Sequence, residues 1–295
     1  MNSIRFSTLI LTSFIFIFNT ASANHGDEEK VIDHNSPSHI LQHAVDAQDD
    51  AAKARYVSRH PKETLEFFGI KPGMKIAEPL PGGGWYTKIL LPYLGKSGHL
   101  VGVDYSYTMH ALRSSKAAFL KKKETWAADW LVSAEPWRNE SSASLSATTF
   151  GTMPAELDNS LDAIVYFRAI HHLTRFEDKG GFFTEAIADS FRVLKSGGIV
   201  GIVQHQARED RPDAWANGDN GYVKKSYVIT AMKAAGFEFV GDSDINENPK
   251  DLAKEGDKVW RLPPTLGVDK ENQELVNAMS EIGESNRMTL KFRKP

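Results

Sequence analysis

The stretch "KIAEPLPGGGWYTKILLPYL", Lys75–Leu94, contains the pattern that decides the fold. Its apolar start predicts a strand over Met74–Glu78, and the run after the glycines predicts a helix over Trp85–Leu94. Between them, Gly82–Gly84 provide a turn in which a backbone without side chains can come close to a ligand. A strand, a glycine turn and a helix in this order are typical of the first unit of a nucleotide-binding α/β domain.

The loop departs from the usual pattern at one position. Leu80 stands where such loops carry their first glycine, and Pro79 and Pro81 flank it. Because a proline favours extended conformations in the residue before it, we expect Leu80 to stay extended and to avoid a positive φ. The turn should then fall on Gly82–Gly84, where a positive φ costs little.

The composition excludes several classes of protein. The chain has 295 residues, of which 41% are hydrophobic and 25% charged, and its net charge is −3. This is the composition of a globular protein, and the acidic balance gives no indication of nucleic-acid binding. The triple lysine Lys121–Lys123 predicts only a solvated helix face. Because the chain has no cysteine, disulfides, thiolate metal sites and a thiol nucleophile are excluded.

The first residues have the pattern of a secretory signal peptide. A positively charged start is followed by the apolar run Leu9–Phe18 and by the small residues Ala21–Ala23. We expect cleavage after Ala23 and export into the periplasm, with no stable membrane anchor in the mature protein. The polar residues 24–50 predict a solvated arm, and because its four histidines have no regular spacing we expect no metal site there.

Residues 51–295 alternate helices and strands and predict one domain. Continuous apolar runs indicate a mostly parallel sheet covered by helices on both faces, a doubly wound α/β fold. The run Arg287–Phe292 predicts a last strand, paired antiparallel with the strand Phe237–Ser243, and residues 244–286 predict an insertion with a helix near Glu271–Ile282. The other predicted strands are His99–Ser106, Ser144–Phe150, Ser160–Phe167 and Gly197–Gln206, and the other predicted helices lie within 51–69 and at Met109–Asp129, Phe182–Leu194 and Ser226–Ala235.

Acidic side chains stand at the carboxyl ends of the first two predicted strands, where parallel sheets bind their ligands. Glu78 ends the first strand, and Asp104 ends the second, 22 residues after Gly82, a spacing typical of a carboxylate that binds ribose hydroxyls. A dinucleotide-binding loop would need glycine at Thr87, and Glu78 would repel a pyrophosphate. Glu78 suits a cation, which favours S-adenosylmethionine, with its sulfonium and ammonium groups, over NAD(P).

Four segments carry a resemblance to a known family. They are "IAEPLPGGGWYT" (Ile76–Thr87), "LVGVDYS" (Leu100–Ser106), "LDAIVYFRAIHHL" (Leu161–Leu173) and "FRVLKSGGIVGIV" (Phe191–Val203). With these segments the chain resembles the class I S-adenosylmethionine-dependent methyltransferases, and among them an exported bacterial subgroup of predicted methyltransferases. The resemblance implies a Rossmann-like, seven-stranded sheet with an antiparallel last strand. It also implies S-adenosylmethionine as the cofactor, bound by Glu78, Gly82, Gly83, Gly84, Trp85, Tyr86, Asp104 and Tyr105.

The resemblance places His171 and His172 beside the methyl group that is transferred. One of them, or His205 after the fifth strand, is a candidate base for a hydroxyl or amine acceptor, since imidazole titrates near neutral pH. The alternative is that the pair has a structural role. Arg168 is a candidate for binding an anionic substrate, or else it pairs with a carboxylate such as Glu185.

Two functions are compatible with these residues. The first is an S-adenosylmethionine-dependent methyltransferase whose acceptor is an unidentified small molecule or envelope component. The second is a non-catalytic exported binding module that retains the methyltransferase fold, because export takes the protein away from the compartment that makes the cofactor. Trp85 and Tyr86 either border the cofactor or only pack the start of their helix against the sheet.

Overall fold

The computed structural model describes residues 33–295. The predicted signal peptide, its cleavage site and the first part of the predicted arm lie outside these residues. Within residues 33–295, none of the helices has the length and apolar character that crossing a bilayer requires.

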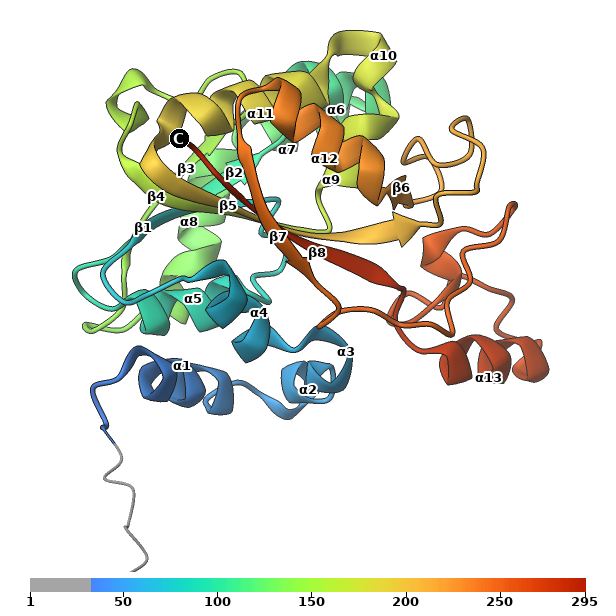
Figure 1. Ribbon diagram of the computed structural model, residues 1–295, viewed down its shortest axis with the longest axis horizontal. Coiled ribbons are helices and arrows are strands. Elements are labelled where there is room, and N and C mark those ends of the chain that lie inside the picture. Colours follow the sequence, from blue (N-terminus) through green and yellow to red (C-terminus); the bar gives the residue numbers. More distant parts are fainter. Residues whose placement is uncertain (1–32) are drawn as a thin grey trace, which may run out of the picture. The chain divides into compact units, whose positions relative to one another are not determined.

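A single mixed sheet organises this part of the chain, in the strand order β3-β2-β1-β4-β5-β8-β7 (Figure 1). The first five strands pair parallel, whereas β8 lies antiparallel between β5 and β7. The doubly wound, mostly parallel fold with an antiparallel last strand is confirmed, including the pairing of that strand with the one before it in sequence. The strands are β1 (Lys75–Pro79), β2 (His99–Asp104), β3 (Ser144–Thr149), β4 (Leu161–Phe167), β5 (Leu194–Ala207), β7 (Glu238–Ser243) and β8 (Arg287–Arg293), and the short β6 (Val223–Lys224) pairs with the end of β5.

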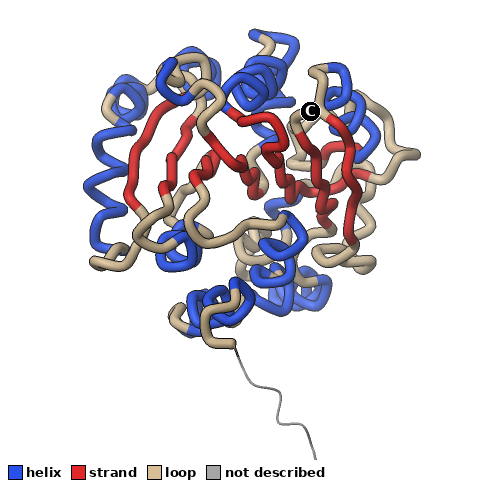
Figure 2. The backbone as a smooth tube through the Cα atoms, turned by 60° about the vertical axis from the view of Figure 1, so that its left-hand side comes forward, coloured by secondary structure: helices blue, strands red, loops and turns tan. Residues whose placement is uncertain are grey.

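Helices cover both faces of the sheet (Figure 2). The central strands are therefore buried on both sides, which explains their continuous apolar runs. The helices are α1 (Pro37–Asp46), α2 (Asp50–Lys53), α3 (Tyr56–Arg59), α4 (Pro61–Phe68), α5 (Thr87–Leu94), α6 (Tyr107–Arg113), α7 (Ala117–Glu124), α8 (Trp126–Ala134), α9 (Ile170–Arg175), α10 (Glu177–Gly180), α11 (Phe182–Val193), α12 (Lys225–Ala234) and α13 (Gln273–Ile282). Helix α13 confirms the helix predicted within the insertion.

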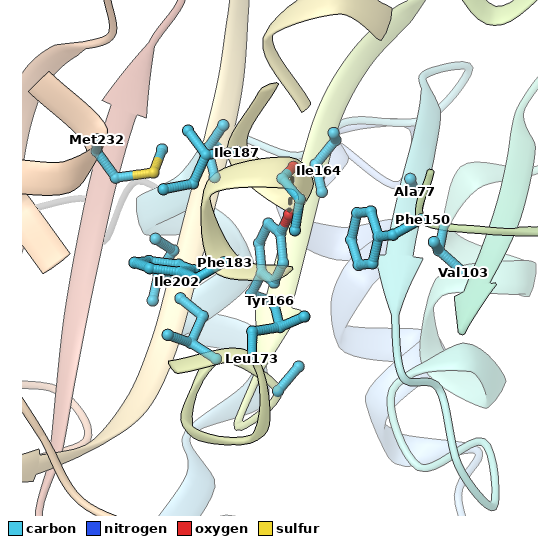
Figure 3. Packing of buried hydrophobic residues seen from close by; sticks show 14 of the residues in the cluster. Ala77, Val103, Phe150, Ile164, Tyr166, Leu173, Phe183, Ile187, Ile202 and Met232 are labelled. Carbon is cyan, nitrogen blue, oxygen red and sulfur yellow. Dashed lines mark hydrogen bonds between the residues drawn. The ribbon is translucent and has the colours of Figure 1, made fainter. Parts of the chain in front are cut away.

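Two cores hold these layers together. On one face, side chains of β4 and β5 pack against helices α9, α11 and α12, and the aromatic rings of Tyr166 and Phe183 lie among the aliphatic side chains (Figure 3). On the other face, side chains of α1, α4 and α5 pack against β1 and β4, with Leu41, Leu65 and Ile89 fully buried. Burying a side chain of this size stabilises the fold by about 1.5–3 kcal/mol.

Helix α1 lies within the residues for which the sequence predicts a solvated arm. The helix begins with Pro37 after the cap residue Ser36, whose hydroxyl accepts a hydrogen bond from the His39 N–H. Leu41 and Val45, one turn apart, are buried in the core. The residues of α1 therefore belong to the folded part of the chain. The spacing of their few apolar side chains is that of a helix, but the polar composition of the segment conceals this pattern.

Residues 107–134 also differ from the prediction, which has one helix over Met109–Asp129. The structure has three helices, because Ser114 is extended with φ −158° and ψ 135° and interrupts the first, and α8 begins after Thr125. Helix α7 contains no buried residue. A segment without an apolar face has no core contact to hold it in one long helix.

Candidate functional site

The chain leaves β1 and β4 through two non-glycine residues with positive φ. Leu80 has a φ of 53° and Arg168 a φ of 58°. Each backbone N–H is tied to the neighbouring strand at 2.7 Å, that of Leu80 to the carbonyl of Val103 and that of Arg168 to the carbonyl of Val203. Such conformations cost about 1–3 kcal/mol each and are concentrated at functional sites. The two turns therefore indicate a functional site at the carboxyl ends of β1 and β4.

The prediction that Leu80 avoids a positive φ is wrong. Its hydrogen bond to β2 keeps Leu80 in register with the sheet, so the chain reverses at Leu80 itself. Gly82 (φ 56°) and Gly84 (φ 78°) complete the turn. A Cβ atom at Gly83 would meet open space, whereas one at Gly84 would lie 2.3 Å from the ring of Trp137. The loop thus presents bare backbone to a free volume at Gly83, and Gly84 is needed for packing.

A cavity of about 700 Å³ opens beside this loop, at the carboxyl ends of β1, β4 and β5. Its wall is formed by the N-terminal helices, the glycine loop, the end of β4 with the turn into α9, the end of β5, and the insertion between β7 and β8. The wall includes Arg55, Arg59, Leu80, Gly82, Gly83, Trp85, Lys88, Phe167, Arg168, His171, His172, His205, Trp260, Glu284 and Ser285.

The structure brings the three candidate catalytic histidines together on this wall. The ring centroids of His171 and His172 are 4.0 Å apart, and those of His171 and His205 are 5.3 Å apart. Burial lowers the pKa of His171 to about 4 and that of His172 to about 2. Burial, followed by His171 and Arg168, also holds the pKa of His205 well below its ordinary value. All three rings are therefore neutral at neutral pH, the form that can accept a proton.

Four arginines surround one buried glutamate at the same cavity, and Arg55, Arg59, Arg168, Arg287 and Glu284 are here called the arginine cluster. Glu284 accepts hydrogen bonds from Arg55 Nε at 2.7 Å, from Arg59 Nε at 3.1 Å and from Arg287 Nη2 at 2.5 Å. Burial alone would raise the pKa of Glu284, but the charges of Arg287, Arg59 and Arg55 outweigh it and keep the pKa below its ordinary value. Glu284 is therefore ionised at neutral pH.

Arg168 lines the cavity beside this glutamate, and its side chain forms no hydrogen bond or salt bridge with any described residue. The alternative prediction, a pair between Arg168 and Glu185, is not formed. Burial, followed by the charges of Arg59 and Arg287, lowers the pKa of Arg168 to about 9. A guanidinium thus faces the cavity without a partner, as a residue that binds an anionic substrate would.

Asp104 is buried at the end of β2 and is not part of the cavity wall. One carboxylate oxygen accepts from the Tyr105 N–H at 2.9 Å, and the other lies 2.7 Å from Lys123 Nζ and 3.1 Å from His110 Nε2. Burial would raise the pKa of Asp104, but His110 and Lys123 outweigh this and lower it. We call Asp104, His110 and Lys123 the Asp104 cluster. Lys123, predicted to be merely solvated, occupies the carboxylate to which ribose hydroxyls would bind.

Glu78 is buried behind the glycine loop rather than in the cavity wall. Its carboxylate accepts a hydrogen bond from the Thr87 hydroxyl at 2.7 Å. Burial raises the pKa of Glu78 to about 7, and the bond from Thr87 only partly opposes this. Thr87, which stands where a dinucleotide-binding loop carries glycine, therefore has a defined role: it ties the start of α5 to the end of β1.

The three aromatic residues predicted to contact the cofactor occupy different surroundings. Trp85 lines the cavity, with the Arg59 guanidinium 4.6 Å from its ring centroid. Tyr86 is buried and stacks on Phe167 at 3.4 Å between centroids. Tyr105 is also buried, and its hydroxyl donates to a backbone carbonyl of the turn into α9 at 2.7 Å. The structure therefore places Trp85 at the cavity, whereas Tyr86 and Tyr105 pack the loops that surround it.

The central part of the chain is similar to known proteins. Residues 79–202 match the family model described as the methyltransferase domain. These residues are therefore similar to a methyltransferase domain. The chain is 26% identical over 214 residues to the sterol 24-C-methyltransferase erg6 of Aspergillus fumigatus, covering 65% of this chain and 47% of that protein. It is 25% identical over 206 residues to the sterol 24-C-methyltransferase ERG6B of Gibberella zeae, covering 65% and 46%. The chain spans about half the length of these curated relatives.

The methyltransferase fold is also found in a solved structure, geranyl diphosphate C-methyltransferase from Streptomyces coelicolor A3(2) in complex with S-adenosyl-L-homocysteine. The TM-score is 0.50 at 13% identity, over 84% of this chain and 85% of that chain, so the likeness concerns the fold alone. The matched domain and these relatives agree with the predicted S-adenosylmethionine-dependent methyltransferase and its cofactor.

The residues of the methyltransferase domain fit this cofactor at two places. The glycine loop offers exposed backbone to the cavity at Gly82 and Gly83. Asp104 stands at the end of β2, and its carboxylate would be available to hydroxyl donors if Lys123 moved away from it. Lys123 is a flexible side chain on α7, a helix without buried residues, so its withdrawal leaves the core intact.

Several residues of the site are not among those predicted from the sequence. Arg55 and Arg59 are spaced one helical turn apart in a segment predicted to be helical, a pattern that indicates one cationic face. Glu284 and Trp260 lie in the insertion, where no sequence pattern indicated a role. Only the topology brings them to the cavity, because β8 is antiparallel and its first residues stand beside the carboxyl end of β5.

Proposed function

We propose that this protein is an exported S-adenosylmethionine-dependent methyltransferase that acts on a small molecule or an envelope component. The observation that supports the proposal best is the shared cavity: the glycine loop of the methyltransferase domain and the three histidines line one volume of about 700 Å³. A loop for the cofactor and a group able to accept a proton thus border the same space, which a methyl transfer to a hydroxyl or amine requires.

The chain contributes positioning and exclusion of water. When bound, the cofactor supplies an electrophilic methyl group on its sulfonium. Gly82 and Gly83 hold the ligand by backbone contact, and Trp85 and Trp260 provide aromatic walls that keep the site dry. A neutral histidine accepts the proton that the acceptor loses. Because the pKa of His171 is about 4, this ring would accept the proton of a hydroxyl acceptor, which becomes strongly acidic as its oxygen is methylated, and not that of an ammonium.

Binding of the cofactor is the direct test. We expect S-adenosyl-L-homocysteine to bind the purified protein in isothermal titration calorimetry. Asp104→Ala removes the carboxylate for the ribose hydroxyls and should weaken this binding about 10–100-fold, since hydrogen bonds to a charged group contribute about 1.5–3 kcal/mol. Asp210→Ala, at an exposed aspartate paired with Arg208, is the matched control and should leave binding unchanged. If the unaltered protein binds neither S-adenosyl-L-homocysteine nor S-adenosylmethionine, the protein is not this enzyme.

The Asp104 cluster favours a second candidate, a non-catalytic exported binding module. In such a module Lys123 would be the permanent partner of Asp104, and the cavity would bind a ligand without methylating it. The module would bind its ligand equally well with and without S-adenosyl-L-homocysteine. Detection of a methylated product from any candidate acceptor would exclude it.

The location of the protein follows from the proposed signal peptide and is tested separately. Expression of the full chain in a bacterium should yield a periplasmic form whose N-terminal residue is Asn24. A cytoplasmic protein that retains Met1 would contradict export and leave the proposed methyl transfer untouched.

A further inference from the structure

The cavity carries more positive than negative charge. Arg55, Arg59, Lys88 and Arg168 line it, against the carboxylates of Glu284 and Asp49. Asp49 is exposed at the mouth, and its carboxylate accepts from the Ala52 N–H as the cap of α2. Arg287 adds a further positive charge behind the wall, through its bond to Glu284.

Donors of the arginine cluster are left without partners inside the protein. Arg59 is 1% exposed, and its Nε donates to Glu284. Its Nη1 and Nη2 are buried and have no hydrogen-bond partner among the described residues. The guanidinium of Arg168, a half-buried residue on the same cavity wall, also has no hydrogen bond or salt bridge with any described residue. Buried charged donors are costly when they are not hydrogen-bonded, so this arrangement indicates a missing acceptor.

The groups nearest to these arginines do not provide that acceptor. Burial keeps the rings of His171, His172 and His205 neutral, and their pKa values are further lowered by neighbouring positive charges, among them Arg168 for His171 and His205. Trp85 and Trp260 add aromatic surface. Next to the arginines, the cavity wall is therefore neutral and partly aromatic. Such a wall suits an organic ligand that carries one anionic group.

We propose that the arginine cluster binds the oxyanion of the methyl acceptor, a carboxylate or a phosphate, between Arg59 and Arg168. That the bound anion is the methyl acceptor rests on the proposed methyltransferase function. That the cluster binds an anion rests on the geometry alone. Planar guanidinium groups match the paired oxygens of carboxylate and phosphate, and such charge-assisted hydrogen bonds are among the strongest in proteins.

The position of the cluster in the chain favours the acceptor over the carboxylate of the cofactor. Residues 79–202 match the methyltransferase domain, and of the five cluster residues only Arg168 lies among them. Arg55, Arg59, Glu284 and Arg287 belong to the N-terminal helices and to the C-terminal end of the chain. A group contributed by elements outside the matched domain is suited to a ligand particular to this protein.

The test uses inorganic phosphate and acetate as probes, titrated into the purified protein by calorimetry at constant ionic strength. We expect one of the two anions to bind, and the stronger of them identifies the class of oxyanion. Arg168→Met should weaken that binding about 10–100-fold, and Arg168→Lys, which keeps the charge but loses the planar fork, should weaken it less. Arg293→Met, at an exposed arginine paired with Glu238 on the opposite edge of the sheet, is the matched control.

S-adenosyl-L-homocysteine, titrated into the same variants, separates this proposal from the proposed function. If Arg168→Met loses the anion and keeps S-adenosyl-L-homocysteine, the acceptor site is supported. If it loses both ligands while circular dichroism shows a folded protein, the cluster binds the cofactor's carboxylate and the proposal is wrong. Absence of anion binding in a protein that binds S-adenosyl-L-homocysteine also overturns it. If the unaltered protein binds the anion but not S-adenosyl-L-homocysteine, the anion site is supported and the proposed methyltransferase function is wrong.

Discussion

Asp104 and Glu284 are both buried carboxylates at the carboxyl edge of the same sheet, and their surroundings differ in charge balance. Asp104 is matched by the ammonium of Lys123, with His110 and a backbone N–H satisfying the remaining acceptor sites. Glu284 stands among four arginines, and donors of Arg59 and Arg168 remain unpaired. The first cluster is complete without a ligand, whereas the second requires an anion. Under the proposed function, the cofactor would bind at a carboxylate whose charge is already matched, and the acceptor at a cluster with an excess of positive charge.

The largest effect is expected from Glu284→Gln. Removing the negative charge leaves three bonded arginines without their counter-ion in a buried place, which should lower the free energy of unfolding by about 3–5 kcal/mol. Urea unfolding measures this change. The exposed pair partner Glu238→Gln is the control and should change stability by less than about 1 kcal/mol. Added phosphate should restore part of the unfolding free energy that Glu284→Gln loses. Equal losses in both variants would show that the arginines do not depend on Glu284 as their counter-ion.

Glu78 is a third buried carboxylate, and it forms no salt bridge with any described residue. The pKa of Glu78 is about 7 in the folded protein and about 4.3 when unfolded, so the folded state retains a proton that the unfolded chain has lost. Its contribution to stability is complete below pH about 4.3 and is lost as the pH rises through about 7. Glu78→Gln cannot lose a proton. The variant should therefore match the wild type below pH about 4.3 and exceed its unfolding free energy by about 3–4 kcal/mol at pH 8.

Urea unfolding at a series of pH values measures this difference. A gap between the two proteins that is constant with pH would contradict a raised pKa for Glu78. The same variant titrated with S-adenosyl-L-homocysteine shows whether the carboxylate also contributes to cofactor binding.

The smallest effect is expected from Lys123→Met, which frees Asp104 from its ammonium partner. If Lys123 competes with the ribose hydroxyls, S-adenosyl-L-homocysteine should bind about 2–10-fold more tightly, since a partly exposed ion pair contributes on the order of 1 kcal/mol. Calorimetry measures the affinity, and Lys122→Met, one residue earlier and exposed, should have no effect. Weaker binding in Lys123→Met would mean that the lysine supports the cofactor site.

The fold was predictable from the sequence because its main signals are local. The apolar runs of β1, β2, β4 and β5 and the glycine turn identify a parallel sheet, and the late run Arg287–Phe292 identifies an antiparallel last strand. Helix α1 was missed because three buried apolar residues in a polar segment give a weak pattern. The positive φ of Leu80 was missed because it depends on a hydrogen bond to β2, and proline rules alone favour the opposite.

The site was predictable only where its residues follow a strand. His171, His172, His205 and Arg168 do so, and the structure places all four on the cavity wall. Arg59 and Glu284 meet through tertiary contacts between distant segments, which no local spacing encodes. The neutrality of the histidines was equally hidden, because it results from burial beside arginines that the sequence does not show as neighbours.

The antiparallel direction of β8 has a consequence for how the protein is made. Arg55 and Glu284, which bond at 2.7 Å through Arg55 Nε, are 229 residues apart in the chain. During synthesis Arg55 and Arg59 emerge early and remain without their carboxylate until Glu284, at the end of the insertion, has left the ribosome. Contacts of such long sequence separation form late in folding. The glycine loop can therefore be in place before the anion site exists, and competence to bind an acceptor is acquired at the last step of assembly.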